Sequence, residues 1–219
     1  MMPKYFGFYG FLLPLLCGLF SSPAVFSAER YKVDREQSCI RVATKMCVPD
    51  LLKGDFGSVS GEIILDEDNL ENSSVSITVT AVDAIFDHEF HRTDNIKDIV
   101  MGAQILNALS FPLIKFKSTE IIRTNAQQFM AHGEKSNVIT ATIKGDLTLV
   151  GETHPFEMEA TFHEKTGLTS KGWIVAAFST FGTLKRSDFG VVYGLDRVGI
   201  RRRGDEVMVM TSITTNRSE

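Results

Sequence analysis

Residues 141–162 read ATIKGDLTLVGETHPFEMEATF. Apolar or small residues occupy every second position from Ala141 to Leu149 and again from Phe156 to Phe162, with mostly polar residues between them. This period of two predicts two β-strands, each with one buried face. The connection around Gly151 is short, and short connections join antiparallel neighbours. The stretch is therefore expected to form a β-hairpin.

The same alternation recurs along most of the chain, and turn signals separate many of the segments. Further strands are expected at residues 38–46, 59–65, 74–81, 114–122, 173–181 and 206–214. The total is eight main strands in an all-β domain. Eight antiparallel strands with one apolar face can form a sandwich or a closed barrel. We favour an eight-stranded antiparallel barrel, because closure removes the exposed edges.

One segment departs from the strand pattern, between the third and fourth main strands. In residues 93–109, apolar side chains recur at helical spacing, ending with Leu109. One crossing helix is predicted here, weakened in its middle by Gly102 and followed by Pro112. The helix has two interpretations: a structural cover packed over one barrel end, or a guard over a cavity.

Length and composition narrow the class of protein. The chain has 219 residues, 43% of them hydrophobic, and a formal net charge of −4. These values fit a single folded domain and exclude a disordered polyelectrolyte or a multi-span membrane protein. No basic excess exists to attract nucleic acid, so no nucleic-acid partner is expected. The aromatic residues are 16 Phe, 4 Tyr and 1 Trp, which predicts an interior rich in apolar rings.

The N-terminal region has the pattern of a secretory signal. Lys4 precedes an uncharged run over residues 5–20, and small residues follow up to Ala28. We predict a signal peptide over residues 1–28 that is removed, leaving an exported domain over residues 29–219. A retained anchor is the weaker alternative, since the run is shorter than a bilayer span and contains Pro14. Cys39 and Cys47 then remain; both fall in one extended segment, so a disulfide would need a tight bend between them.

Four blocks, in this order, resemble the YceI-like family. They are FP at residues 111–112 with FKST at 116–119, GDLTLVG at 145–151 with THP at 153–155, LKRSDFG at 184–190, and GDEV at 204–207. The likeness extends from about Tyr31 to Thr214. It implies a lipocalin-like barrel, exported to the periplasm, that binds polyisoprenoids or fatty-acid derivatives inside, with no established catalytic residues. It also implies that a homodimer could form. The chain departs from the family at Asn95, where His is common.

A ligand inside the barrel would contact the apolar faces of several strands. The candidate ligand-binding residues are Phe116, Ile143, Leu147, Phe156, Phe162 and Trp173. Small residues assigned to the same faces, Gly61, Gly145, Ala160 and Ala177, are expected to leave room for it. Transfer of about 20 carbons at roughly 0.8 kcal/mol each exceeds an association cost of about 4–15 kcal/mol. A bound long-chain lipid and no cofactor are therefore expected; the alternative is a solid core of interlocked rings.

Basic residues gather near the end of the chain. Residues 185–203 contain six Lys or Arg and two Asp, and three of the basic residues are consecutive: Arg201, Arg202 and Arg203. Guanidinium groups suit phosphate or carboxylate, so this triplet is predicted to bind an anionic head group. A solvated loop is the simpler interpretation. Transient contact with an anionic membrane surface is compatible with either.

Catalytic interpretations have weaker support. His88 and His91 lie three apart beside acidic residues, but they do not form the HExxH motif. His154 and His163 fall on opposite faces of one strand, because nine is an odd spacing. We therefore predict a non-catalytic exported protein that holds a long-chain isoprenoid or fatty-acid-type ligand for transport or storage. The alternatives are a metal-dependent small hydrolase using the segment with His88 and His91, and a structural envelope protein with a solid core.

Overall fold

The computed structural model describes residues 28–47, 50–88, 96–124, 130–131, 134–135, 139–166, 175–196 and 204–217. Its strands are β1 (Glu29–Val33), β2 (Cys39–Cys47), β3 (Asp50–Phe56), β4 (Val59–Leu65), β5 (Ser74–Thr80), β6 (Ile85–His88), β7 (Leu113–Thr124), β8 (Met130–Ala131), β9 (Glu134–Lys135), β10 (Ile139–Leu149), β11 (Glu152–Thr166), β12 (Val175–Lys185) and β13 (Glu206–Arg217). The helices are α1 (Ile96–Met101) and three 3-10 turns, η1 (Leu70–Asn72), η2 (Ala81–Asp83) and η3 (Arg186–Phe189). Within these ranges, no helix is long and apolar enough to span a membrane.

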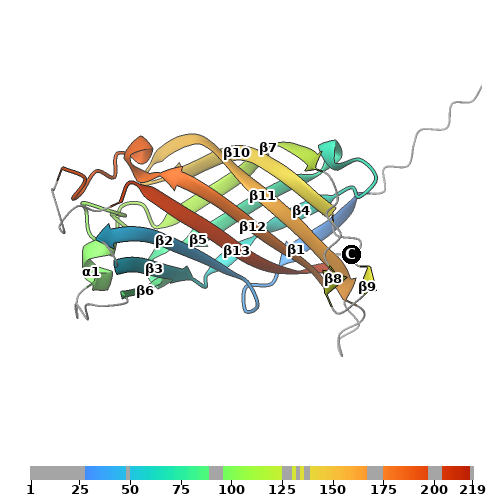
Figure 1. Ribbon diagram of the computed structural model, residues 1–219, viewed down its shortest axis with the longest axis horizontal. Helices are drawn as coiled ribbons and strands as arrows, with labels where there is room; N and C mark the ends of the chain where they lie inside the picture. Colours follow the sequence, from blue (N-terminus) through green and yellow to red (C-terminus); the bar gives the residue numbers. More distant parts are fainter. Residues whose placement is uncertain are drawn as a thin grey trace, which may run out of the picture.

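The strands form a closed antiparallel barrel (Figure 1), which confirms the predicted fold class. Its strand order is β1-β4-β5-β7-β10-β11-β12-β13, and β1 pairs with β13 to close the ring. At the closure Tyr31 pairs with Arg217, and Arg217 forms a 3.3 Å ion pair with Glu29. The predicted eight strands included β2 but omitted β1, which is short and therefore gives a weak periodic signal.

The barrel strand beside β13 is interrupted, and this shapes one end of the molecule. β1 and β2 lie end to end along β13, where Val33 pairs with Thr215 and Cys39 with Ser212. β3 and β6 extend the sheet beyond β2, so that β6 is the last strand of the described sheet. Figure 1 shows α1 at this end, beside β2, β3 and β6. The end of the barrel near α1 is therefore built differently from the end that carries β8 and β9.

The predicted helix is much shorter in the structure than in the sequence pattern. α1 ends at Met101, and Gly102 starts a series of turns in which the amides of Ile105 and Asn107 donate to the Gly102 carbonyl. Glycine favours this break because it loses more backbone conformational entropy in a helix than any other residue. Leu109, the last apolar position of the predicted segment, is 95% exposed and is not part of its buried side. Residues 93–95, the first of the predicted helical segment, lie outside the described residues.

Cys39 and Cys47 lie on one strand. β2 runs without a break from Cys39 to Cys47, so the tight bend that a disulfide between them would require is not formed. Cys39 is an exposed free thiol. The predicted extended segment is confirmed.

Candidate ligand-binding cavity

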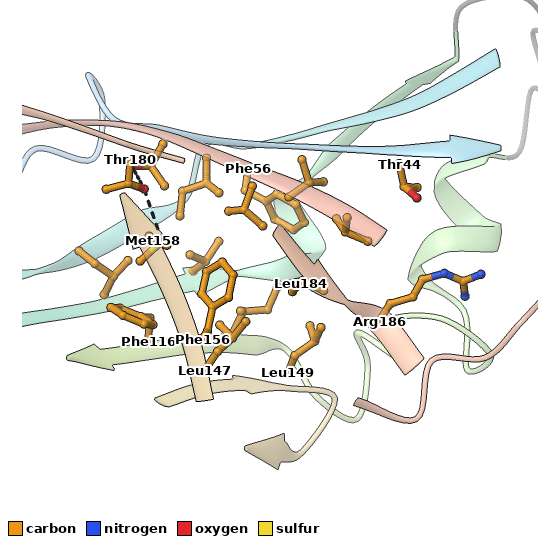
Figure 2. Close-up of a pocket in the computed structure, with 18 of the residues that line it drawn as sticks. Thr44, Phe56, Phe116, Leu147, Leu149, Phe156, Met158, Thr180, Leu184 and Arg186 are labelled. Atoms are coloured by element: carbon orange, nitrogen blue, oxygen red, sulfur yellow. Dashed lines mark hydrogen bonds between the residues drawn. The ribbon is translucent and has the colours of Figure 1, made fainter. Parts of the chain in front are cut away.

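A cavity of about 230 Å³ lies inside the barrel at the end covered by α1 (Figure 2). Its wall is built by strand alternation. On β13 every second residue, from Val207 through Val209 and Thr211 to Ile213, faces the cavity. Val209 is paired with Val42 of β2, which lines the cavity from the adjacent strand. The period-two pattern of the sequence thus becomes a continuous apolar surface.

The cover over this end comes from the segment that follows β6. Val100 of α1, together with Ile105 and Leu106 of the turns after it, contributes to the lining. Val100 is buried, whereas Ile105 and Leu106 are partly buried. The position of this segment fits both interpretations drawn from the sequence, a cover over one barrel end and a guard over a cavity, although the described residues after Met101 form turns rather than helix.

Four of the predicted ligand-binding residues lie together on one part of the wall. Phe116 of β7, Ile143 and Leu147 of β10, and Phe156 of β11 all line the cavity. The rings of Phe116 and Phe156 meet edge to face, with centroids 6.3 Å apart. Figure 2 shows Phe116, Phe156 and Leu147 side by side. Each of the four was predicted from the sequence because it lies on the apolar face of an alternating strand.

The other predicted residues fall elsewhere. Phe162 is buried, but it lies beyond the cavity, stacked on Phe178. Trp173, Arg201, Arg202 and Arg203 lie outside the described residues. His91 also lies outside them, as does the side chain of His88.

The glycines predicted to leave room do not open onto empty space. A β-carbon on Gly145 would lie 2.4 Å from the Lys117 carbonyl oxygen and 2.6 Å from the Phe116 ring. At Gly61, which has a φ of +152°, it would lie 2.1 Å from the Ser76 carbonyl oxygen. Both glycines permit close approach of a neighbouring strand. Of the small residues named from the sequence, Ala160 is the one that lines the cavity.

The inward face of β12 was also assigned incorrectly. Ala176, Phe178 and Thr180 face the interior, whereas Ala177 lies on the opposite face and Phe181 is 49% exposed. The sequence of this strand has small and aromatic residues on both faces, so alternation alone could not decide the register.

The few polar groups of the wall are bonded to other parts of the barrel. Thr180 donates to the Met158 sulfur at 3.4 Å, the contact drawn in Figure 2, and its hydroxyl lies 2.9 Å from that of Thr211. Thr44 donates to the Glu206 carbonyl at 2.8 Å. Internal partners reduce the cost of burying hydroxyls. The surface offered to a ligand is consequently almost entirely apolar.

Arg186 is the one charged residue among the described residues that line the cavity. It is buried, and its Nε and Nη1 donate to the carbonyl oxygens of Gly204 and Val191 at 2.8 and 2.7 Å. Figure 2 shows it at one end of the group of labelled side chains, beyond Leu184. The sequence counted Arg186 only as part of a basic region; its place in the LKRSDFG block was the signal that could have singled it out.

The histidines with described side chains do not form a common site. The His163 ring lies 2.8 Å from the Ser179 hydroxyl, and the His154 ring meets Phe189 edge-on at 5.0 Å. Their predicted separation is confirmed. In the part of the chain that the structure describes, no three His, Cys, Asp or Glu side chains are grouped as metal ligands would be.

The family model of the YceI-like domain matches residues 31–215. The chain belongs to the YceI-like family. A UPF0312 protein of Pseudomonas putida is 30% identical to this YceI-like chain over 181 residues, which cover 82% of the chain and 84% of that protein.

Solved structures share the YceI-like barrel. BcnA of Burkholderia cenocepacia is 22% identical and superposes with a TM-score of 0.63, covering 83% of this chain and 98% of BcnA. A polyisoprenoid binding domain from Saccharophagus degradans, implicated in plant cell wall breakdown, is 9% identical with a TM-score of 0.60. That match covers 86% of this chain and 98% of the other. At these identities the likeness concerns the fold.

Proposed function

We propose that this protein binds a long-chain isoprenoid or fatty-acid-type molecule inside its barrel, for transport or storage and without catalysis. The observation that carries the proposal is the apolar cavity of about 230 Å³ at the α1 end. Its wall combines phenylalanine rings with branched aliphatic side chains, and its threonines already have partners within the protein. Such a wall favours a hydrocarbon chain over a polar metabolite.

The free energy of binding would come from removing the chain from water. Each buried methylene contributes roughly 0.8 kcal/mol, so even a partly enclosed chain offsets much of an association cost of about 4–15 kcal/mol. The fold neighbour from Saccharophagus degradans, a polyisoprenoid binding domain, supports an isoprenoid as the first class of ligand to test.

The polar end of the ligand is proposed to lie at the α1 end of the barrel. Gly204 lines the cavity there, and Arg201, Arg202 and Arg203 immediately precede it in the sequence. These three residues are proposed to bind an anionic head group. The proposal has three further parts, which come from the sequence. They are export to the periplasm after removal of residues 1–28, transient contact with a membrane surface, and formation of a homodimer.

Two measurements test this function. Protein purified from its native host should release an isoprenoid or acyl lipid on solvent extraction, identified by mass spectrometry. In vitro, the protein should take up the fluorescent apolar probe N-phenyl-1-naphthylamine, and prenyl alcohols or fatty acids should displace it. Protein that yields no lipid and binds none of these compounds would contradict the proposal.

A matched pair of variants locates the binding. Val209→Phe adds a ring to the cavity wall, whereas Met210→Phe adds one to the outward face of the same strand. We expect Val209→Phe to weaken probe binding at least tenfold and Met210→Phe to leave it within about twofold of wild type. Equal effects of the two substitutions would place the probe elsewhere.

A further inference from the structure

The cavity stops at one level of the barrel, although the barrel continues. The last inward residues that line it on three consecutive strands are Ala160 of β11, Phe178 of β12 and Ile213 of β13. The next inward positions toward the far end, Phe162, Ala176 and Thr215, are buried but do not line it. The interior therefore has a hollow part next to α1 and a filled part beyond it.

Phe178 stands at the boundary between these two parts. Its ring stacks on Phe162, with centroids 5.0 Å apart and planes inclined by 29°. Tyr31, which is fully buried, meets the same ring edge-on at 6.2 Å. Beyond the rings, the Thr215 hydroxyl donates to the Ala176 carbonyl at 2.9 Å. The Phe178 ring thus contacts the cavity on one side and packs against Phe162 and Tyr31 of the filled part on the other.

We propose that Phe178 is a specificity-determining residue that limits how much of a ligand's chain the barrel encloses. The inference rests on the proposed function, because it assumes that the cavity holds a hydrocarbon chain. It adds a definite length limit, set by the stacked rings of Phe178 and Phe162.

The geometry gives the size of this limit. From Leu184 to Phe178 the lining covers six steps of β12, which is about 20 Å at 3.3 Å per residue. A strand tilt of about 40° reduces the depth along the barrel axis to about 15 Å. An extended chain advances roughly 1.2 Å per bond, so about twelve bonds fit above Phe178.

Affinity should therefore depend on chain length in two stages. Each added methylene should strengthen binding about fourfold while it is enclosed, as expected for roughly 0.8 kcal/mol. Beyond about twelve bonds the added carbons stay outside, and affinity should stop rising. Phe178→Ala should extend the enclosed length, whereas Ala160→Leu, which adds bulk beside Thr180 and thus one inward step nearer α1, should shorten it.

The test is a displacement series with geraniol, farnesol and geranylgeraniol against N-phenyl-1-naphthylamine. These prenyl alcohols have about eight, twelve and sixteen bonds along the chain. For the wild type we expect a gain of roughly 250-fold from geraniol to farnesol, and a gain of less than about threefold from farnesol to geranylgeraniol. For Phe178→Ala the second step should exceed about tenfold.

The matched control is Phe181→Ala, which removes the same ring from the outward face of β12. It should keep the wild-type plateau. If Phe178→Ala does not fold, Ala160→Leu tests the length limit instead, because its affinity should stop rising at a chain shorter than farnesol. Continued gain through geranylgeraniol in the wild type, or an unchanged plateau in the folded variants, would overturn the length limit. Failure of every prenyl alcohol and fatty acid to displace the probe would instead overturn the proposed function and remove the basis for the limit.

Discussion

Phe162 and Phe178 face each other across β11 and β12 as register partners, and their rings stack at a centroid distance of 5.0 Å. This pair separates two kinds of interior in one barrel. Toward α1, inward side chains enclose about 230 Å³ of space. Toward the other end, Tyr31, Ala176 and Thr215 are fully buried. The hollow and solid interiors that the sequence left as alternatives are both present, each in its own part of the barrel.

The stacked pair should contribute strongly to stability. Phe162→Ala removes a buried ring and should lower the free energy of unfolding by about 3–5 kcal/mol, measured by urea denaturation. A double-mutant cycle with Phe178→Ala should give a coupling of about 0.5–1.5 kcal/mol. The control is Phe181→Ala, on the outward face of β12, which should lower the free energy of unfolding much less. Purely additive losses would show that the two rings act independently.

Gly145 should not tolerate even a methyl group. An added β-carbon would lie 2.4 Å from a backbone oxygen of β7, and backbone atoms yield less easily than a flexible side chain. Gly145→Ala should therefore lower the free energy of unfolding by about 1–3 kcal/mol. Gly57→Ala, where no atom lies within 4 Å of the added carbon, should change it little. Thermal and urea denaturation of both variants compare the two sites directly.

Arg186 should hold together the loops at the α1 end. It connects η3 to Val191 and Gly204 through two hydrogen bonds from one guanidinium group. Arg186→Met should lower the free energy of unfolding by about 1.5–3 kcal/mol for each charge-assisted bond lost. Arg186→Lys should recover only part of this, because an ammonium group lacks the planar fork of a guanidinium. Lys185→Met, an exposed neighbour, serves as the control; a similar loss there would argue against a specific role for Arg186.

Acid should weaken the loop before β5 through Asp66. Hydrogen bonds from the Asn69 amide and the Asn72 side chain lower the pKa of the Asp66 carboxyl. Since the pKa in the folded state lies below the unfolded value of about 3.9, the stabilisation is present above that pH. It is lost as the pH falls through the folded pKa. In Asp66→Asn the free energy of unfolding, measured by urea denaturation, should depend less on pH below about pH 4 than in the wild type.

Asp68→Asn is the matched control for the removal of one negative charge in the same loop. Asp68 is exposed, whereas Asp66 is buried. A curve flattened equally by both substitutions would assign the effect to net charge rather than to the hydrogen bonds of Asp66.

Replacing Arg201, Arg202 and Arg203 by Ser should distinguish head groups. If these residues bind an anionic group, the triple variant should bind farnesyl phosphate at least tenfold more weakly than the wild type and farnesol about equally. The difference should shrink at high salt, because exposed charges are screened. Equal weakening of both compounds would remove the head-group role.

Much of the fold was available from the sequence because strand patterning is local. Alternation around Ala141, Ile143 and Leu147 marked a strand whose inward side chains are buried in the structure. The short connection at Gly151 fixed the pairing of β10 with β11. Phe116, Ile143, Leu147 and Phe156 could each be assigned to an inward face because each lies on the apolar side of an alternating strand. Local signals failed where the chain was ambiguous, as on β12, or where a single Gly102 ended a helix early.

The sequence by itself determined most of the barrel strands, the antiparallel pairing of those joined by short turns, and the apolar character of most inner faces, because these depend on neighbours two residues apart or joined by short turns. Tertiary structure alone decided that β1 closes the ring, that Phe178 rather than Ala177 faces inward, and that the cavity ends at the ring stack with Phe162. Free volume depends on how side chains from distant strands fill a shared interior. No local sequence pattern predicts this free volume, since it is set only when the closed sheet brings those side chains together.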